Sequence, residues 1–199
     1  MGRSPKFSRD QILDAALAIT AEGGPAAATM TAIAARLGAP IGSLYHRFGS
    51  HDLLLATLWT RTAHDFQRGF VTALAAGDAE AAALHTPRWC RDHPAEAALL
   101  LLHRRRELAA TWPAELGEDL DTLDGRLADA VDSFVARHPG LTGDRLTFAV
   151  VDIPYGAVRR HLLAGHPPPP AIDELILAAA RAVLAPVLTG PRSRRATAP

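Results

Sequence analysis

The chain has 199 residues, of which 48% are hydrophobic, and its 21 basic and 21 acidic side chains give a formal net charge of zero. A single cysteine, Cys90, excludes an internal disulfide framework and is typical of a reducing compartment. The apolar run AALLLL at 97–102 is far shorter than the roughly 18 residues of a membrane span, and acidic residues interrupt the N-terminal segment where a signal peptide would be apolar, so we expect a soluble, cytoplasmic protein with no membrane partner.

Apolar residues recur at helical spacing along almost the whole chain, which predicts an all-α fold. Ser8, Thr29 and Ser50 stand where helix N-caps are expected, and Gly38 is expected to end the second helix. Breaks that contain Gly or Pro separate the later helices. These signals predict about nine helices: from Ser8 to the EGGP sequence at 22–25, from Thr29 to Leu37, at 41–48, from 50 to about 76, and roughly at 79–92, 95–110, 114–137, 144–164 and 171–188.

Charge is unevenly distributed over these helices. Residues 1–50 carry five basic and three acidic side chains, whereas residues 51–191 carry 13 basic and 18 acidic ones. A basic end on an acidic body is expected of a polyanion-binding domain joined to a non-binding one, although uneven charge without any function gives the same numbers. We therefore predict a three-helix domain at 1–50, a helical body at 51–190 linked to it by the fourth helix, and a disordered tail at 191–199.

The segment GAPIGSLYHRF at 38–48 interrupts the helical pattern with two glycines and a proline before a short amphipathic helix. At 100° per residue, one side of this helix is apolar and expected to be buried; it consists of Ile41, Leu44, Tyr45 and Phe48. The opposite side is small, polar and cationic; it consists of Gly42, Ser43, His46 and Arg47. A helix of barely two turns is unstable alone, so packing against the first two helices must hold it.

The short, glycine-containing turn LGAP at 37–40 joins this helix to the one before it, as in a helix-turn-helix motif. The second helix of that motif enters the DNA major groove, where its outward side chains contact base edges and their neighbours contact phosphates. The alternative interpretation is a tight helical corner with a few polar residues outside.

In these residues and those around them, the chain resembles the TetR/AcrR family of bacterial transcriptional regulators. The resemblance runs from SRDQILDAALAITAEGG through TMTAIAARLGAPIGSLYHRFGSHDLLLATLW, that is, from Ser8 to Trp59. It implies a homodimer that inserts two recognition helices into a near-palindromic operator in double-stranded DNA. It also implies that a small-molecule effector bound in the body releases the DNA, with repression as the usual mode and no cofactor.

Matched positions imply roles for individual side chains. Tyr45 is expected to place its hydroxyl on a phosphate, the alternative being a plain core aromatic residue, and Gly42 is expected to let DNA approach closely. The other expected DNA contacts are Ser43, His46 and Arg47 on the recognition helix, Thr29 and Thr31 at the start of the second helix, and Lys6 in the N-terminal arm. The alternatives are that Thr29 serves only as an N-cap and that the arm is uninvolved.

Three positions depart from the family pattern. Pro40 stands where Ser or Thr is frequent, and it fits the first helical turn but supplies no side-chain cap. Thr31 stands where many members have a basic residue, and His51 replaces a phosphate-contacting lysine. We hypothesise that His51 contacts phosphate only when protonated, so that affinity for DNA rises between about pH 7.5 and pH 6.

The resemblance implies that the last two predicted helices form the dimer surface, where apolar residues follow helical spacing and small residues allow close approach. The residues expected there are Ile172, Leu175, Ile176, Ala179, Val183 and Val187. An ordinary internal helix face is the alternative.

The effector site is expected near DIPYG at 152–156, where Pro154 distorts a helix beside a cavity. The residues expected to line it are Trp59, Phe66, Phe70, Trp89, Asp152 and Tyr155. Aromatic residues at this spacing also fit a packed core. The arginines of HRRRE at 103–107 fit either an anionic effector or a solvated face.

No nucleophile with a base, no paired carboxylates and no complete metal-ligand set is recognisable, so we predict neither an enzyme nor a metal site. Cys90 and His93 lie three residues apart, but two ligands do not close a zinc site. Apart from a metal-binding or catalytic body, the alternative function is that of a helix-turn-helix protein without a ligand response.

Overall fold

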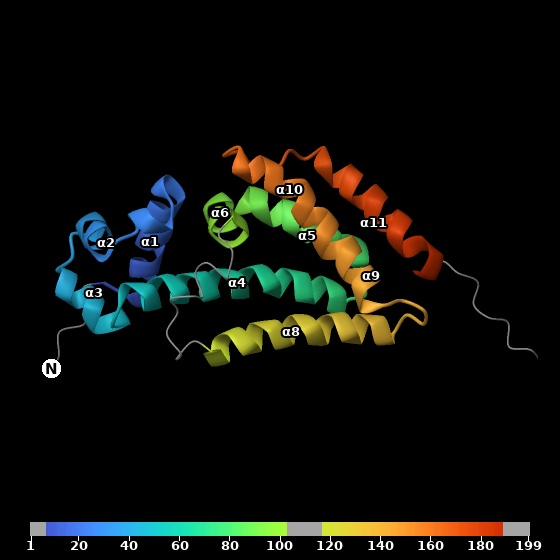
Figure 1. Ribbon diagram of the computed structural model, residues 1–199, viewed down its shortest axis with the longest axis horizontal. Helices are drawn as coiled ribbons and strands as arrows, with labels where there is room; N and C mark the ends of the chain where they lie inside the picture. Colours follow the sequence, from blue (N-terminus) through green and yellow to red (C-terminus); the bar gives the residue numbers. More distant parts are fainter. Residues whose placement is uncertain (1–6, 103–116, 189–199) are drawn as a thin grey trace, which may run out of the picture.

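The computed structural model describes residues 7–102 and 117–188, and every regular element in these two ranges is helical (Figure 1). The elements are α1 (Arg9–Gly23), η1 (Pro25–Ala27), α2 (Met30–Leu37), α3 (Ile41–Phe48), α4 (His51–Ala75), α5 (Ala79–Asp92), α6 (Pro94–Leu102), α8 (Gly117–Ala136), α9 (Gly143–Thr147), η3 (Phe148–Asp152), α10 (Ile153–Leu163) and α11 (Ile172–Leu188). The predicted all-α fold is confirmed. Within the same ranges, none of the helices combines the length and apolarity needed to cross a bilayer.

The predicted helix starts are confirmed by their caps. The Ser8 hydroxyl accepts a hydrogen bond from the Gln11 backbone N–H, and the Gln11 side chain reaches back to the Ser8 N–H, which completes a capping box. The Thr29 and Ser50 hydroxyls likewise accept from the N–H groups three residues on, at 3.1 Å in both cases. Each cap satisfies a donor that a helix start otherwise leaves without a partner, so these local signals suffice to begin α1, α2 and α4.

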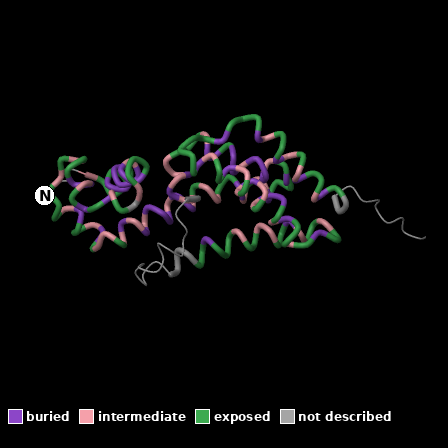
Figure 2. The backbone as a smooth tube through the Cα atoms, turned by 45° about the horizontal axis from the view of Figure 1, so that its top comes forward, coloured by how far each residue is buried: buried purple, intermediate pink, exposed green. Residues whose placement is uncertain are grey.

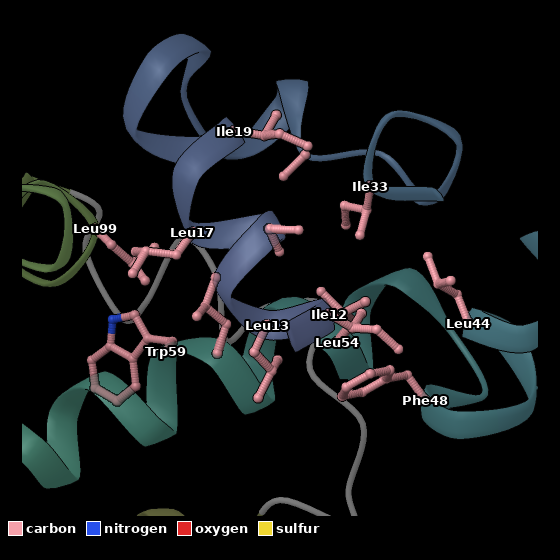
Figure 3. Packing of buried hydrophobic residues seen from close by; sticks show 14 of the residues in the cluster. Ile12, Leu13, Leu17, Ile19, Ile33, Leu44, Phe48, Leu54, Trp59 and Leu99 are labelled. Atoms are coloured by element: carbon pink, nitrogen blue, oxygen red, sulfur yellow. The ribbon is translucent and has the colours of Figure 1, made fainter. Parts of the chain in front are cut away.

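Helix α4 connects the α1–α3 unit to the rest of the molecule, as its course across Figure 1 shows. A hydrophobic cluster joins α1, α2 and α3 to the first turns of α4 (Figure 3). The same cluster continues into α6, because Leu99 packs beside Leu17 of α1 and Trp59 of α4. A rearrangement at α4 and α6 therefore acts directly on the residues that hold α1.

A second hydrophobic cluster lies in the other half of the molecule, among α4, α5, α8, α9, η3 and α11, whose inward residues are buried along the interior (Figure 2). Two bidentate ion pairs hold α11 against α5: Arg91 with Asp173 at 3.0 and 2.7 Å, and Arg181 with Glu80 at 2.7 and 2.6 Å. Both arginines use the paired N–H groups that match a carboxylate. The position of α11 on the body is thus set by charge as well as by apolar contact.

The helix predicted at 144–164 is divided rather than simply kinked at Pro154. A π-helical turn, η3, occupies Phe148–Asp152, and the N–H of Ile153 donates to the carbonyl of Phe148, five residues earlier. Pro154 follows in the first turn of α10, where its missing N–H breaks no helical hydrogen bond. The wider turn rotates the residues after it relative to those before it.

Several predicted features lie outside the described residues. These are Lys6 in the N-terminal arm, the end of the helix predicted at 95–110, the HRRRE sequence at 103–107, the first residues of the helix predicted at 114–137, and the tail at 191–199.

Candidate nucleic-acid interface and body cavity

A tight turn sets the angle between α2 and α3. Gly38 adopts φ 60° and ψ 35°, a left-handed conformation that favours glycine. Its N–H and that of Ala39 donate to the Ala35 and Ala34 carbonyls at 3.2 and 2.9 Å, which satisfies the end of α2. At the start of α3, the Pro40 carbonyl accepts from both the backbone N–H and the hydroxyl of Ser43, at 3.0 and 2.7 Å. Ser43 thus supplies a hydrogen bond at a helix start where Pro40 provides no side-chain cap.

Helix α3 is held by only two of its side chains. Leu44 is fully buried and Phe48 is 1% exposed, and both point toward Ile12, Ile33 and Leu54 (Figure 3). The Arg9 guanidinium lies over the Phe48 ring, 4.7 Å from its centroid, and covers its outer side.

The predicted burial of Ile41 and Tyr45 is wrong, because their side chains are 43% and 47% exposed. With only two turns, α3 contacts α1, α2 and α4 along the narrow strip of Leu44 and Phe48. Ile41 and Tyr45 lie next to this strip on the helix wheel, but their side chains extend beyond the helices that cover Leu44 and Phe48. The exposed face of α3 is therefore made of Ile41, Gly42, Tyr45 and His46, with Ser43 and Arg47 half-buried at its flank.

This exposed face has free hydrogen-bonding groups. Among the described residues, the side chains of Tyr45, His46 and Arg47 have no hydrogen-bond or ion-pair partner. A Cβ added at Gly42 would meet no atom within 4 Å, so packing within the protein does not require glycine there. The face can approach another molecule closely and offer it a phenol hydroxyl, an imidazole and a guanidinium.

Helix α2 precedes α3 in the chain, and its first turn has polar groups of its own. The Thr29 hydroxyl is used by its capping bond, whereas Thr31 is exposed in the first turn, where backbone N–H groups favour an anion. Arg36, at the other end of α2, pairs bidentately with Glu22 of α1 at 3.0 and 2.6 Å. Arg36 is thereby committed to fixing α2 on α1.

A cavity of about 180 Å³ opens beside α4 in the body. Three predicted residues, Trp59, Phe66 and Phe70, line it together. The prediction missed the others, which are Ala63, Gln67, Thr86, Leu100, Leu127 and Val151. Ala63 and Gln67 follow Trp59 at helical spacing of four and eight residues, so extending that face along α4 would have found them. The other four come from α5, α6, α8 and η3, which no local spacing relates to α4.

Trp89, Asp152 and Tyr155 do not line this cavity, so their prediction as wall residues is wrong for it. Trp89 packs edge-on against Phe66, with 5.1 Å between ring centroids, and borders an open groove between α4 and α5 instead. Val151 is the residue of η3 that contributes to the wall. Asp152 is the next residue round the helix and is exposed, and Tyr155 is half-buried on α10.

His85 of α5 lies directly on the backbone of α4. Its Nε2 is 2.7 Å from the Phe66 carbonyl oxygen, to which it donates, and a Cβ on Gly69 would lie only 2.5 Å from its Cε1. A side chain at position 69 would therefore force the His85 ring to shift. Burial lowers the pKa of His85 below its usual 6.5, the nearby His93 lowers it further, and the hydrogen bond to Phe66 opposes both.

Acidification is expected to destabilise the body through His85. Because its pKa is lower in the folded protein than in the unfolded chain, the unfolded chain binds more protons between the two pKa values. The free energy of unfolding is expected to fall as the pH drops below about 6.5. Denaturant titrations at pH 7.5 and 5.5 measure this, and a His85→Gln variant is expected to lose less stability between the two. Equal losses in the two proteins would contradict the assignment.

The comparison with known families decides the kind of domain that carries the exposed α3. Residues 12–58, from α1 into α4, match the model described as bacterial regulatory proteins, tetR family. These residues therefore form a domain of the TetR family. A search among curated proteins gave no match.

Solved structures of transcriptional regulators share the fold over most of the chain. One from Marinobacter aquaeolei VT8 superposes with a TM-score of 0.63 at 17% identity, covering 88% of this chain and 94% of that one. The ketosteroid transcriptional regulator KstR2 of Mycobacterium tuberculosis gives 0.60 at 18% identity, with 92% and 96% covered. FadR of Bacillus subtilis, in complex with stearoyl-CoA, gives 0.58 at 16%, with 92% and 100% covered. At such identities, these likenesses describe the fold.

His51, the departure from the TetR family pattern at the start of α4, has a contact within the chain. Its Nε2 lies 3.0 Å from the Ala28 carbonyl oxygen, which can only accept, so this nitrogen carries the hydrogen. Its Nδ1 lies 3.6 Å from a carboxylate oxygen of Asp52. The His51 ring thus links the start of α4 to Ala28. The sequence alone did not indicate this positioning role. A phosphate contact by protonated His51 stays a prediction.

The dimer surface expected by resemblance to the TetR family needs a correction on α11. Ile172 and Ile176 are 4% and 1% exposed and, with Ala180 and Leu184, pack into the core of their own chain. Leu175 is 66% exposed, whereas Ala179 and Val183 are half-buried; the side chain of Val187 lies outside the described set. The helical spacing of apolar residues identifies an apolar face of a helix, but it does not show whether that face packs on the chain's own core or on a partner. On α11, the apolar residues spaced by four face the chain's own core.

Proposed function

We propose that this protein is a homodimeric transcriptional repressor that binds a near-palindromic operator through α3 and is released by a small-molecule effector. We assign DNA binding to residues 1–50 and effector binding and dimerisation to residues 51–190. The observation that carries the proposal is the exposed, unpartnered face of α3, held behind a helix-turn-helix corner in a TetR family domain.

Helix α3 is proposed to lie in the major groove with this face toward the bases. Tyr45, at one edge, donates its hydroxyl to a phosphate, and His46 faces the base edges. Arg47, half-buried at the flank, contacts a phosphate or guanine, and Gly42 lets the backbone approach. Thr31 and the first N–H groups of α2 take a second phosphate, and Ser43 stays with the Pro40 carbonyl.

Ile41 adds an apolar contact to this proposed interface. An exposed isoleucine at the start of a recognition helix has no packing reason to be there, since Leu44 and Phe48 hold the helix. The methyl group of thymine is the apolar feature of the major groove. We therefore assign Ile41 to a thymine in each half-site.

Dimerisation through η3, α10 and α11 is supported by where apolar side chains are exposed. Among the described residues, the large exposed hydrophobic side chains are Ile41 and Tyr45 on α3, and Phe148, Leu163 and Leu175 in the body. The second group fits a contact between two copies, with Ala178 and Ala182 exposed on α11 to allow close approach. A two-turn helix makes few DNA contacts, and two copies on one dimer supply the missing affinity through effective concentration.

The route from effector to DNA is proposed to run through α4 and α6. Five residues of the cavity wall belong to α4, whose first turn carries His51 against Ala28. On α6, Leu100 lines the cavity while its neighbour Leu99 packs with α1. A molecule that displaces either helix therefore moves α1–α3. The complex of B. subtilis FadR with stearoyl-CoA supports a ligand role for a body of this fold.

The test is selection of bound sequences from a random duplex pool at a fixed salt concentration, about 100 mM. The expected result is a near-palindrome whose half-sites lie about one helical turn, or a multiple of it, apart. No enrichment, even at low salt, would reject the operator-binding function.

Replacing Ile41 with alanine is expected to remove a thymine preference. The loss of its methyl contact should reduce discrimination at one position of each half-site by about fivefold or more, since a wrong base pair costs about 1–3 kcal/mol. Parallel selections with native protein and the variant measure this. Tyr45→Phe is the contrast, because losing a phosphate contact should lower affinity evenly across sequences. Unchanged enrichment of every base in Ile41→Ala would refute the contact.

A further inference from the structure

We propose that the cavity beside α4 selects an uncharged molecule with a single aromatic ring and one hydrogen-bond donor. The role of this molecule as the effector rests on the proposed function, whereas its binding does not depend on DNA.

The volume limits the ligand to one ring. The cavity measures about 180 Å³. An apolar cavity of about 150 Å³ in another protein binds benzene, so this one has room for a ring and one or two substituent atoms. A ligand as large as the stearoyl-CoA of the B. subtilis FadR complex does not fit this volume.

The wall favours an aromatic ring. Three aromatic side chains of α4, Trp59, Phe66 and Phe70, contribute to it. Such rings pack an aromatic guest edge-on or offset, and this adds to the gain from burying its apolar surface. Aliphatic side chains of α6, α8 and η3 contribute to the rest of the wall; they are Leu100, Leu127 and Val151.

The hydrogen-bond donor is inferred from Gln67. Its Oε1 is buried and accepts no hydrogen bond from any described residue. An acceptor left in this state costs free energy, which a donor on a bound molecule would recover. The terminal torsion of glutamine is soft, so the amide can turn toward the cavity that its side chain borders. Thr86 of α5 is the hydroxyl-bearing residue of the wall and can also bind such a group.

The same wall excludes a charged ligand. None of the described residues that line the cavity is charged. A carboxylate or ammonium group would lose its hydration there without gaining an ion pair. The ligand is therefore neutral, as phenols are at neutral pH.

Calorimetric titration of the full chain without DNA tests the proposal with three probes: phenol, toluene and benzoate. Toluene has the same ring without the donor, and benzoate has the ring with a charge. Phenol and toluene are both expected to bind, and benzoate is not. In Gln67→Leu, the ratio of the phenol Kd to the toluene Kd is expected to rise about tenfold, because only phenol loses a hydrogen bond. Gln67→Met, of similar length, serves if the leucine variant does not fold.

The matched control is Arg68→Met on the exposed side of α4, which should leave both Kd values unchanged. A ratio that stays the same in both Gln67 variants would overturn the donor requirement. Benzoate binding as tight as that of phenol, or no binding by phenol or toluene, would overturn the ligand class.

Operator binding by the same proteins without probe keeps the two proposals separate. Intact operator binding with no phenol binding would reject only the ligand class. If phenol binding depends on Gln67 but no operator is found, the ligand site is supported and its role as the effector site is rejected.

Discussion

Replacing Tyr45 with phenylalanine is expected to weaken operator binding by about 100-fold or more. A hydrogen bond to a charged group contributes about 1.5–3 kcal/mol, and a dimer on a palindrome loses two of them, so the loss is about 3 kcal/mol or more. The folded protein should be unaffected, because the Tyr45 side chain is 47% exposed and, among the described residues, its hydroxyl has no partner. Fluorescence anisotropy with the selected operator at fixed salt measures the change.

Tyr155→Phe is the matched control for this substitution. It removes the same hydroxyl from a half-buried tyrosine on α10, in the body and away from α3. Operator affinity within about twofold of the native protein is expected for it. If the two variants bind the operator equally well, Tyr45 does not contact phosphate.

Replacing Ile33 with alanine is expected to destabilise the α1–α3 unit by about 2–5 kcal/mol, the usual cost of truncating a buried isoleucine. Ile33 of α2 is fully buried and points toward Leu44 of α3 (Figure 3). Since α3 is too short to hold its shape alone, the cavity left by Ile33 removes part of the surface on which it packs. Operator binding should be lost together with the fold of this unit.

Ile41→Ala is the matched control, since it makes the same chemical change on a side chain that is 43% exposed. A loss of less than about 1 kcal/mol is expected for it. Denaturant unfolding followed by far-UV circular dichroism measures both variants. Equal losses would mean that Ile41 and Ile33 are packed alike, contrary to the structure.

Local signals were sufficient for the helices and their ends. Ser8, Thr29, Gly38 and Ser50 each act through atoms within five residues, so their roles follow from the sequence around them. The division of 144–164 was harder, because a π-helical turn depends on packing as well as on Pro154. Three of the residues predicted to line the cavity, Trp59, Phe66 and Phe70, were also found from local spacing, because they share one face of α4.

What the sequence by itself determined is the all-α fold, from helical spacing along almost the whole chain, and the helix-turn-helix corner with its TetR family domain, from short-range spacing within residues 8–59. Only the tertiary structure decided which faces are covered. Ile41 and Tyr45 are apolar or aromatic yet exposed, because α3 extends beyond the helices that pack on it. Ile172 and Ile176 face inward, because ion pairs and apolar contacts hold α11 on its own body. Periodicity gives the direction of a side chain relative to its own helix, whereas burial depends on neighbours from distant parts of the chain.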